Sequence, residues 1–241
     1  MPNFVELWVY LSATPLFGLT ATVVAYVLAY GIYVRTHHAP WANPVLWTVV
    51  CLAALLTLSG TPYPTYFSGA QFIHFLLGPA VVALAWPLWQ RRAELRARWA
   101  TLLAIALAGG LTASGTAWLL GWAFGLPTVV VLSLVPKSVT APVAMGIAEK
   151  IGGIPALAAV FAVITGLVGA IAGKYLFDAL RIPTDSKGWA ARGFALGTAS
   201  HGIGAARALQ VNADAGAYAG LALGLQVVLA SLLIPLAFKL F

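Results

Sequence analysis

Long apolar runs restrict what this chain can fold into more than any other feature. The runs follow one another closely: 61% of the 241 residues are hydrophobic, 8% are charged, and the mean hydropathy is +0.94. A soluble domain is about 45–50% apolar and about 25% charged, so water cannot surround a chain of this composition. A run of about 20 apolar residues is long enough to cross a bilayer as a helix. The sequence therefore predicts an all-α polytopic membrane protein.

About seven transmembrane helices and one interrupted segment are expected, in a single transmembrane domain over residues 1–241. The predicted spans are 7–34, 44–59, 71–90, 99–123, 154–173, 190–209 and 214–240. The interrupted segment is 127–149, where Pro136 and Pro142 disturb a helix because proline lacks a backbone donor. We expect a re-entrant hairpin there, since non-helical backbone at membrane depth must be enclosed by protein or line a cavity. A further break is expected at Pro79.

Cations indicate how the chain lies in the bacterial cytoplasmic (inner) membrane, because loops rich in Lys and Arg stay in the cytoplasm. Basic residues follow the first, third and fifth spans: Arg35, Arg91, Arg92, Arg96, Arg98, Lys174, Arg181, Lys187 and Arg192. Placing these loops inside puts the N-terminus outside. With a re-entrant hairpin at 127–149, the C-terminus and Lys239 are cytoplasmic. The basic residues are dispersed among the loops between apolar segments, so membrane orientation explains the net charge of +7 and no nucleic-acid partner is expected.

The segment 136–142 combines a cation with hydroxyl groups inside the interrupted region. Proline suits the first turn of a helix, so a half-helix beginning after Pro136 would present free N–H groups at its positive end. Lys137, Ser138 and Thr140 would add one charge and two hydroxyl donors, a combination that suits a small carboxylate. The alternative is that Lys137 extends to the membrane interface while the hydroxyls cap the backbone.

A second polar segment lies within the predicted span 190–209. Its glycines permit unwinding or close approach of the backbone, and they are Gly197, Gly202 and Gly204. Its polar members are Thr198, Ser200, His201 and Arg207. Arg207 can hold a carboxylate with two hydrogen bonds, and His201 titrates near neutral pH and can couple a proton to solute movement. The alternative is that the small residues serve tight helix packing and that His201 bonds to a backbone carbonyl.

Other chemistry finds little support in the sequence. Glu149 stands at the end of the interrupted segment, where it is either a coupling carboxylate or simply solvated. Ser200 and His201 are adjacent, but the strand–turn–helix context of a serine hydrolase is missing, so we expect no enzyme. The histidines lack metal-ligand spacing and the single Cys51 excludes a multi-cysteine site, so neither a metal nor an organic cofactor is expected.

The sequence resembles the LrgB/CidB family at these same residues. The matching strings are PKSVTAP at 136–142, IGGIPA at 151–156, ARG at 191–193, GTASH at 197–201, RA at 207–208 and PAVVALA at 79–85. The resemblance covers most of the chain from about Pro44 onward. Where members commonly carry threonine, this chain has Ala141 and Ala205, and each replacement removes a hydroxyl ligand.

The resemblance implies two functions. The family has been described as holin-like or antiholin-like modulators of murein hydrolase activity and autolysis that work with an LrgA/CidA-like membrane partner. It is also similar to the membrane domain of the plastidial glycolate/glycerate translocator, and bacterial members are linked to the movement of pyruvate and related acids. The plastid protein fuses LrgA-like and LrgB-like parts, so the resemblance implies a separate LrgA-like partner here.

We expect a secondary transporter of small monocarboxylates of the glycolate, glycerate, pyruvate or lactate class. Cations inside a bilayer are expensive, and a holin-like lesion does not need them. The carboxylate would bind near the midplane through Lys137, Arg207 and backbone amides, with H+ or Na+ as coupling ion. The broken elements near 71–90, 127–149 and 190–209 would form the site. Broken-helix architecture also predicts inverted repeats, a homodimer and an elevator-like movement of the hairpin and the glycine-rich segment against a scaffold of the early spans. The antiholin-like function is the alternative.

Overall fold

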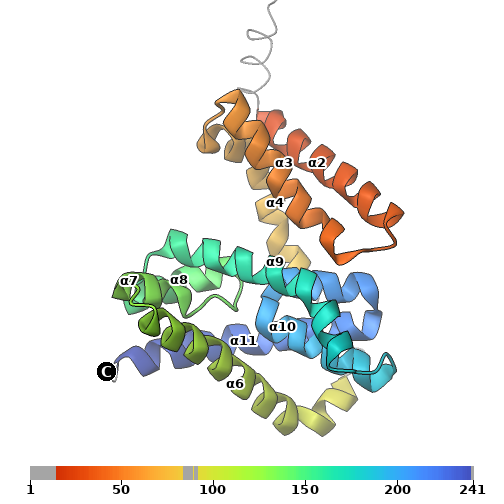
Figure 1. Ribbon diagram of the computed structural model, residues 1–241, viewed down its shortest axis with the longest axis vertical. Coiled ribbons are helices and arrows are strands. Elements are labelled where there is room, and N and C mark those ends of the chain that lie inside the picture. The colour runs from red at the N-terminus through yellow and green to blue at the C-terminus, as the bar shows by residue number, and fades with distance from the viewer. Residues whose placement is uncertain (1–14, 84–88, 90–91, 240–241) are drawn as a thin grey trace, which may run out of the picture. The chain divides into compact units, whose positions relative to one another are not determined.

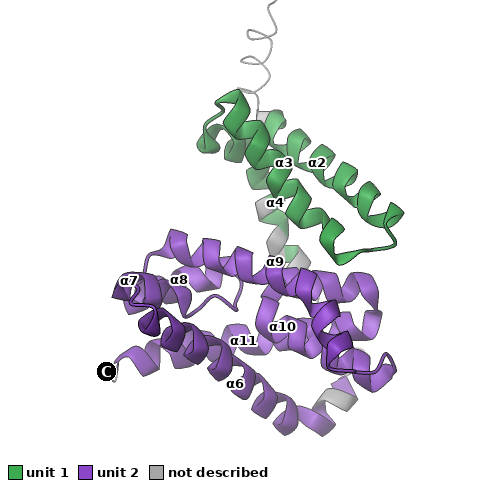
Figure 2. Ribbon diagram, in the orientation of Figure 1, with its two compact units in different colours: residues 1–83 green, residues 84–241 purple. Residues whose placement is uncertain are grey.

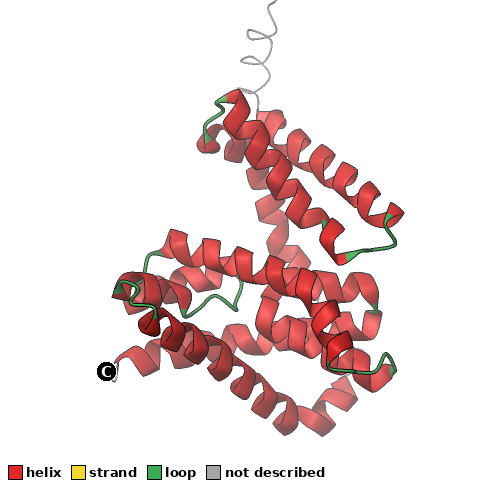
Figure 3. Cartoon of the chain, viewed as in Figure 1, coloured by secondary structure: helices red, strands yellow, loops and turns green. Residues whose placement is uncertain are grey.

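The computed structural model of the protein describes residues 15–83, 89 and 92–239. These residues form helices joined by turns and short loops, with no strand among them (Figure 3). They divide into two compact units, Met1–Ala83 and Leu84–Phe241, which Figure 2 colours separately. Within the described residues, 4 helices are long and apolar enough to cross a bilayer, and a shorter apolar helix accompanies them. The chain is therefore an all-helical, multi-pass membrane protein.

Unit 1 is a bundle of three apolar helices. Its elements are α2 (Pro15–Arg35), the short 3-10 helix η1 (Pro40–Ala42), α3 (Pro44–Ser59) and α4 (Tyr63–Ala83), and α2 packs on both α3 and α4. Asn43 caps α3 by accepting hydrogen bonds from the amides of Val45 (2.9 Å) and Leu46 (3.2 Å). Gly60 ends the same helix with a φ of 64°, a conformation that glycine adopts without strain.

The predicted break at Pro79 is not present, because α4 continues through this residue to Ala83. A proline interrupts one backbone hydrogen bond, but a membrane helix tolerates that loss where its surroundings satisfy the freed carbonyl. The predicted span 44–59 coincides with α3. Three other predicted spans lie partly outside the described residues. These parts are residues 7–14 of the span 7–34, residues 84–88 and 90 of the span 71–90, and residue 240 of the span 214–240.

Unit 2 is built around its last two helices, which pack extensively on each other. Its described helices are α6 (Arg92–Ala123), α7 (Thr128–Leu134), α8 (Ala141–Ile151), α9 (Pro155–Ala179), α10 (Ser186–Val211) and α11 (Ala213–Lys239). The most extensive contact is between α10 and α11, and α9 packs on α10 from the other side (Figure 1). The small α8 packs against both α9 and α11, while α6 borders α7, α10 and α11.

The helix α10 is a hairpin of two arms rather than a straight span. The backbone leaves the helical conformation at Ser200 (φ −125°, ψ 16°) and His201 (φ 40°, ψ −134°). Beyond this point the chain doubles back, because a Cβ placed on Gly204 would lie 2.6 Å from the carbonyl oxygen of Leu196. In a straight helix these two residues would be about 12 Å apart. The first arm (186–199) and the second arm (202–211) are therefore each too short to cross a bilayer, and the prediction of a full span at 190–209 is wrong.

The interrupted segment 127–149 forms the other hairpin of this unit. It consists of α7 and α8, joined by residues 135–140. Seven and 11 helical residues extend about 10 Å and about 16 Å, well short of the roughly 30 Å of a hydrocarbon core. The predicted interruption is present, and neither part can span alone. Unit 2 thus contains two hairpins, and each is followed by a long helix.

The direction of α11 follows from its packing on the first arm of α10. A Cβ on Gly193 would overlap the carbonyl of Ala215, and one on Gly197 would overlap the carbonyl of Ala219. The two helices therefore run parallel, which requires that the second arm brings the chain back to the end where α10 began. As Figure 1 shows, α11 ends beside the α7–α8 hairpin. Lys239 thus lies at the opposite end of unit 2 from Lys187, and the expectation that both occupy one side is wrong.

The hairpin form of α10 predicts a specific pattern of exposure to a membrane-impermeant maleimide. Single cysteines replace exposed residues in a Cys51→Ala background. Lys187→Cys and Gln210→Cys, at the two ends of α10, should be labelled from the same side of intact vesicles. Lys239→Cys and the control Thr128→Cys, at the start of α7, should be labelled only from the other side. Labelling of Lys187→Cys and Gln210→Cys from opposite sides would show that α10 crosses the bilayer.

Candidate functional site

The tip of the α7–α8 hairpin turns apolar residues inward and two polar residues outward. Val135 and Val139 are buried in a core cluster with residues of α8, α9 and α11. The amide of Lys137 donates to the carbonyl of Leu134 (3.1 Å), so this residue lies in a turn and not in a helix. Lys137 and Ser138 are left to line a cavity on the other side of the tip.

The helix that follows this tip begins later than the sequence predicts. We expected a half-helix from Lys137 onward, but α8 begins at Ala141, with Pro142 in its first turn. Both Pro136 and Pro142 suit a first helical turn, so local preference does not choose between them. Thr140 is the N-cap of α8, is half-buried, and makes no side-chain capping hydrogen bond.

Glycines along α9 let the α10 tip approach closely. A Cβ on Gly166 would lie 2.8 Å from His201 Nε2, and one on Gly169 would overlap Ser200 Oγ. A Cβ on Gly173 would lie 2.8 Å from the side chain of Leu196. The three glycines recur about one helical turn apart, so they form one face of α9 against α10. This spacing is the sequence signal that would have assigned α9 to the site.

An open cavity of about 1030 Å³ lies between α6, α9, α10 and the α7–α8 tip. Four of the seven predicted binding residues line it, namely Lys137, Ser138, Thr198 and Ser200. The last three are buried, and we call this part of the cavity its deep end. Thr165 and Gly169 of α9 and Thr112 of α6 line the same region, and sequence reasoning missed all three. The polar residues of the two hairpin tips therefore meet at one cavity.

This polar meeting point lies at mid-length of the long helices. Gly169 is the fifteenth of the 25 residues of α9 counted from Pro155, and Gly109, which contacts Thr198 at the tip of α10, is the eighteenth of the 32 residues of α6. A helix of 25 residues is about 38 Å long, so its middle residues are nearly 20 Å from either end. In a helix that crosses a bilayer, that depth corresponds to the hydrocarbon interior.

Two hydroxyl groups at this depth have unused hydrogen-bonding capacity. Ser138 and Thr198 are each 7% exposed, and their hydroxyl oxygens have no hydrogen-bond partner among the described residues. The methyl group of Thr198 faces α6, since a Cβ on Gly109 would lie 2.6 Å from Thr198 Cγ2. A buried polar group without a partner costs about 1–3 kcal/mol, so such groups mark places where a ligand or water is accommodated.

The charges that line this cavity are all positive. Among the described residues they are Arg98, Lys137 and Lys187, and no carboxylate lines it. Lys137 is half-buried and directly precedes Ser138 in the sequence, while Arg98 and Lys187 are exposed. The arrangement can bind an anion, because an ammonium group in a poorly hydrated environment is stabilised by an opposite charge.

His201 is buried at the tip of α10 and contacts α9. It is 4% exposed, and its Nε2 lies 2.7 Å from the carbonyl oxygen of Ala162 on α9. The sequence analysis gave two interpretations of His201, and the structure shows the second, in which the side chain bonds to a backbone carbonyl. His201 also carries a positive φ, which a non-glycine residue adopts with strain. The side chain ties the α10 tip to α9 and does not line the cavity.

Three other predicted site residues also lie outside the cavity lining. Arg207 is buried in the second arm of α10, six residues beyond His201. Glu149 is exposed in the last turn of α8. Thr140 is the N-cap already described. The glycines differ as well: Gly197 allows close packing on α11, Gly204 allows the return of the second arm, and Gly202 has open space around it.

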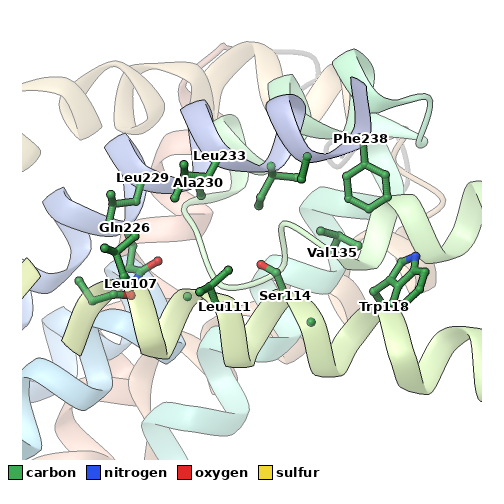
Figure 4. A pocket seen from close by; sticks show the side chains of 15 residues that line it. Leu107, Leu111, Ser114, Trp118, Val135, Gln226, Leu229, Ala230, Leu233 and Phe238 are labelled. Atoms are coloured by element: carbon green, nitrogen blue, oxygen red, sulfur yellow. Dashed lines mark hydrogen bonds between the residues drawn. The ribbon is translucent and has the colours of Figure 1, made fainter. Parts of the chain in front are cut away.

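A second cavity, of about 510 Å³, lies between α6 and α11 (Figure 4). Its wall is almost entirely apolar, with Leu111, Trp118, Leu233 and Phe238 among the side chains that face it. Its main polar side chain, Gln226, already donates a hydrogen bond to the carbonyl of Ala106. This cavity lacks a charge, so the anion-binding chemistry belongs to the first one.

Comparison with known proteins assigns the chain to a family. The model of the LrgB-like family matches residues 22–240. The chain belongs to the LrgB-like family. It is 36% identical over 220 residues to the Bacillus subtilis protein YxaC, covering 91% of this chain and 94% of that protein. It is 31% identical over 220 residues to the Holin-like protein CidB of Staphylococcus aureus strain Mu50, with the same shares of the two chains.

A third relative, from Haemophilus influenzae, is 34% identical over 198 residues, which are 82% of this chain and 84% of that protein. No solved structure matches the chain. The LrgB-like family match spans both compact units, so unit 1 and unit 2 belong to one family domain architecture. The membership confirms the resemblance recognised from the segments around Lys137 and His201.

The strained backbone at His201 predicts opposite effects of glycine at two neighbouring positions. His201→Gly and His201→Ala both remove the hydrogen bond to Ala162, but only alanine keeps a Cβ at positive φ. The glycine variant should therefore be more stable than the alanine variant by about 1 kcal/mol, measured by thermal unfolding in detergent. Ala199→Gly, in the regular first arm, should instead destabilise the protein by about 0.5–1 kcal/mol. Equal stability of the two His201 variants would show that this backbone is unstrained.

Proposed function

We propose that this protein is a secondary transporter of small monocarboxylates, of the glycolate, glycerate, pyruvate or lactate class. The observation that carries the proposal is the cavity where Lys137 meets the partnerless hydroxyls of Ser138 and Thr198 at mid-length of the long helices. A carboxylate supplies the negative charge and the acceptor oxygens that these three groups lack. Each hydroxyl that donates to it recovers the hydrogen bond that burial removed.

The size of the cavity fits a small acid that binds together with water. Ligand pockets are commonly about 300–1,000 Å³, and the share of one water in the liquid is about 30 Å³. A two- or three-carbon acid therefore fills only part of the cavity, and waters can complete its hydration. Discrimination would come from Lys137 and the hydroxyls at the deep end rather than from a tight apolar fit.

The two hairpins supply a mechanism for alternating access. Their tips, at residues 135–140 and 200–201, are the parts of unit 2 where backbone departs from helix near mid-length. Transporters with inverted repeats bind solutes at such paired discontinuities and move one part of the fold against another. We propose an elevator-like movement in which α2–α4 act as the scaffold. Coupling to H+ or Na+ would then occur at the tips, and His201 would serve as a structural link between α9 and α10.

The setting of this transporter is the bacterial cytoplasmic membrane. With the cation-rich end of unit 2 in the cytoplasm, the positive-inside tendency places the start of α6 and both ends of α10 inside. In this proposal the N-terminus is outside, and the C-terminus is outside as well because α11 runs parallel to the first arm of α10. A homodimer and an LrgA/CidA-like partner are part of the proposal, because the resemblance implies the partner and broken-helix carriers are commonly dimeric.

A holin-like or antiholin-like function is the second candidate, and the comparisons favour it over the transporter. Relatives from several Staphylococcus strains carry the name Holin-like protein CidB, whereas none of the names quoted above mentions a solute. In that case the chain modulates murein hydrolase activity and autolysis together with a partner. The transporter proposal rests on geometry, since a lesion in the membrane needs neither Lys137 nor partnerless hydroxyls at depth.

Uptake of labelled pyruvate and glycolate into proteoliposomes tests the transporter. Lys137→Ala should reduce uptake at least tenfold, because about 1.4 kcal/mol of lost binding is a factor of ten. Thr198→Val, which keeps the shape and removes the hydroxyl, should raise the KM several-fold. Lys150→Ala, an exposed lysine at the end of α8, is the matched control and should transport like the unaltered chain. Uptake that is equal in all four proteins would remove the cavity from the mechanism.

Leakage of a large fluorescent dye from the same vesicles distinguishes the second candidate. A carrier exposes its site to one side at a time, so vesicles that accumulate pyruvate should retain the dye at every protein-to-lipid ratio. A holin-like lesion needs several copies, so dye release should rise steeply as that ratio increases. Dye release without saturable pyruvate uptake would favour the holin-like function and contradict the carrier.

A further inference from the structure

The second cavity of unit 2, of about 510 Å³ between α6 and α11, has walls that favour an apolar occupant over water. No charged side chain is among the described residues that line it, and the side chains with a polar atom are those of Ser114, Trp118 and Gln226. The Gln226 amide already donates a hydrogen bond to the carbonyl of Ala106. A water molecule needs two to four polar partners, and most of this wall offers none.

The cavity is elongated along the two helices. Figure 4 shows Gln226 at one end and Trp118 with Phe238 at the other. Gln226 precedes Phe238 by 12 residues, and its hydrogen-bond partner Ala106 precedes Trp118 by the same 12 residues. At about 1.5 Å per residue, the cavity is therefore about 18 Å long.

The two ends of the cavity lie at different depths in the membrane. Gln226 is the fourteenth of the 27 residues of α11, so this end is at the middle of a membrane-spanning helix. Trp118 and Phe238 are near the ends of their helices, since α6 ends at Ala123 and α11 ends at Lys239. Half of a hydrocarbon core is about 15 Å thick. The cavity thus extends over the depth of one lipid leaflet, which is the depth of one lipid tail.

The rim of the cavity is exposed, whereas its floor is buried. Leu111 and Leu233 on the rim are 67% and 39% exposed, while Ala230 and Ile234 are each 8% exposed. Lipid tails surround helices that cross a bilayer, so a tail can enter from the side without passing through water.

The floor of the cavity includes the back of the α7–α8 tip. Val135 lines it and belongs to the same core cluster as Ala230 and Ile234. Two residues further along the chain, Lys137 lines the larger cavity on the other side of the tip. An occupant would therefore add dispersion contacts behind the tip, in a place where the protein supplies no side chain.

We infer that this cavity binds one acyl chain of a phospholipid. The end of the chain lies at Gln226, and the headgroup lies at the membrane surface beyond Trp118 and Phe238. The volume agrees with this, because a methylene group takes up roughly the 30 Å³ of one water, and about 510 Å³ then holds about 17 methylenes. We call this space the acyl-chain cavity. The inference is independent of the proposed function, since a holin-like protein could bind a lipid in the same way.

Three leucine substitutions provide the test. Gly115 lines the acyl-chain cavity and a Cβ placed on it would have open space around it, so Gly115→Leu fills part of the cavity without a clash. Ala237→Leu fills it from an exposed position on α11 and is the second variant, in case the first does not fold. Gly224→Leu is the matched control, because Gly224 also has open space around it but lines neither cavity.

Native mass spectrometry of the full chain, purified in detergent with added phosphatidylethanolamine and phosphatidylglycerol, measures the bound lipid. The unaltered protein and Gly224→Leu should retain one phospholipid under activation that removes all others. Gly115→Leu and Ala237→Leu should retain it at least about tenfold less, because each methylene lost from an apolar site weakens binding about fourfold. Adding the phospholipid should also raise the Tm of the first two proteins more than that of the filled variants.

Three outcomes would overturn the inference. Equal retention in all four proteins would place the lipid elsewhere. An unaltered protein that retains no lipid would show that another part of the chain fills the cavity. A dimer that the two filling substitutions convert into monomers would show that a second copy covers it. None of these measurements needs solute uptake, so failure of the transporter proposal would leave the lipid result standing.

Discussion

Backbone that leaves the helical conformation inside a bilayer must be enclosed by protein, and unit 2 is organised around that requirement. Its two hairpin tips, at residues 135–140 and at Ser200–His201, break the helical hydrogen-bond ladder near mid-length of the neighbouring helices. Lipid offers no hydrogen bonds to such backbone. Close packing of α9 and α11 on the tips supplies the enclosure, and the bond from His201 to the carbonyl of Ala162 joins one tip to α9. Residues of both tips line the same cavity.

Small residues make this enclosure possible. Gly166, Gly169 and Gly173 bring α9 against the α10 tip, and Gly193 and Gly197 bring α11 against the first arm. Helix packing in membranes depends on such close approach, because lipid tails are as apolar as the side chains they would displace. The glycines that looked like points of unwinding in the sequence therefore act as contact surfaces. The actual turn of the backbone falls on His201, one residue before Gly202.

Several parts of the site could be predicted from local chemistry. Lys137, Ser138, Thr198 and Ser200 stand out because polar groups are rare in apolar runs, and the fold brings all four to one cavity. Arg207, His201 and Glu149 stood out for the same reason but do not line it. Glu149 is exposed at the end of α8, His201 bonds to α9, and the reversal of α10 carries Arg207 into the second arm. A hydropathy pattern contains no term for such a reversal, so it assigned one span where there are two short arms.

The sequence by itself determined that this protein lives in a membrane, that it is helical, and that its helices are interrupted around Pro136. Those properties follow from composition and from proline and glycine chemistry, which act within a few residues. Only the tertiary structure decided where α8 begins, which way α11 runs, and which cations share a cavity with the hydroxyls. These outcomes depend on contacts between residues far apart in the chain, such as Gly197 with Ala219 and Gly109 with Thr198, and no local preference encodes such pairings.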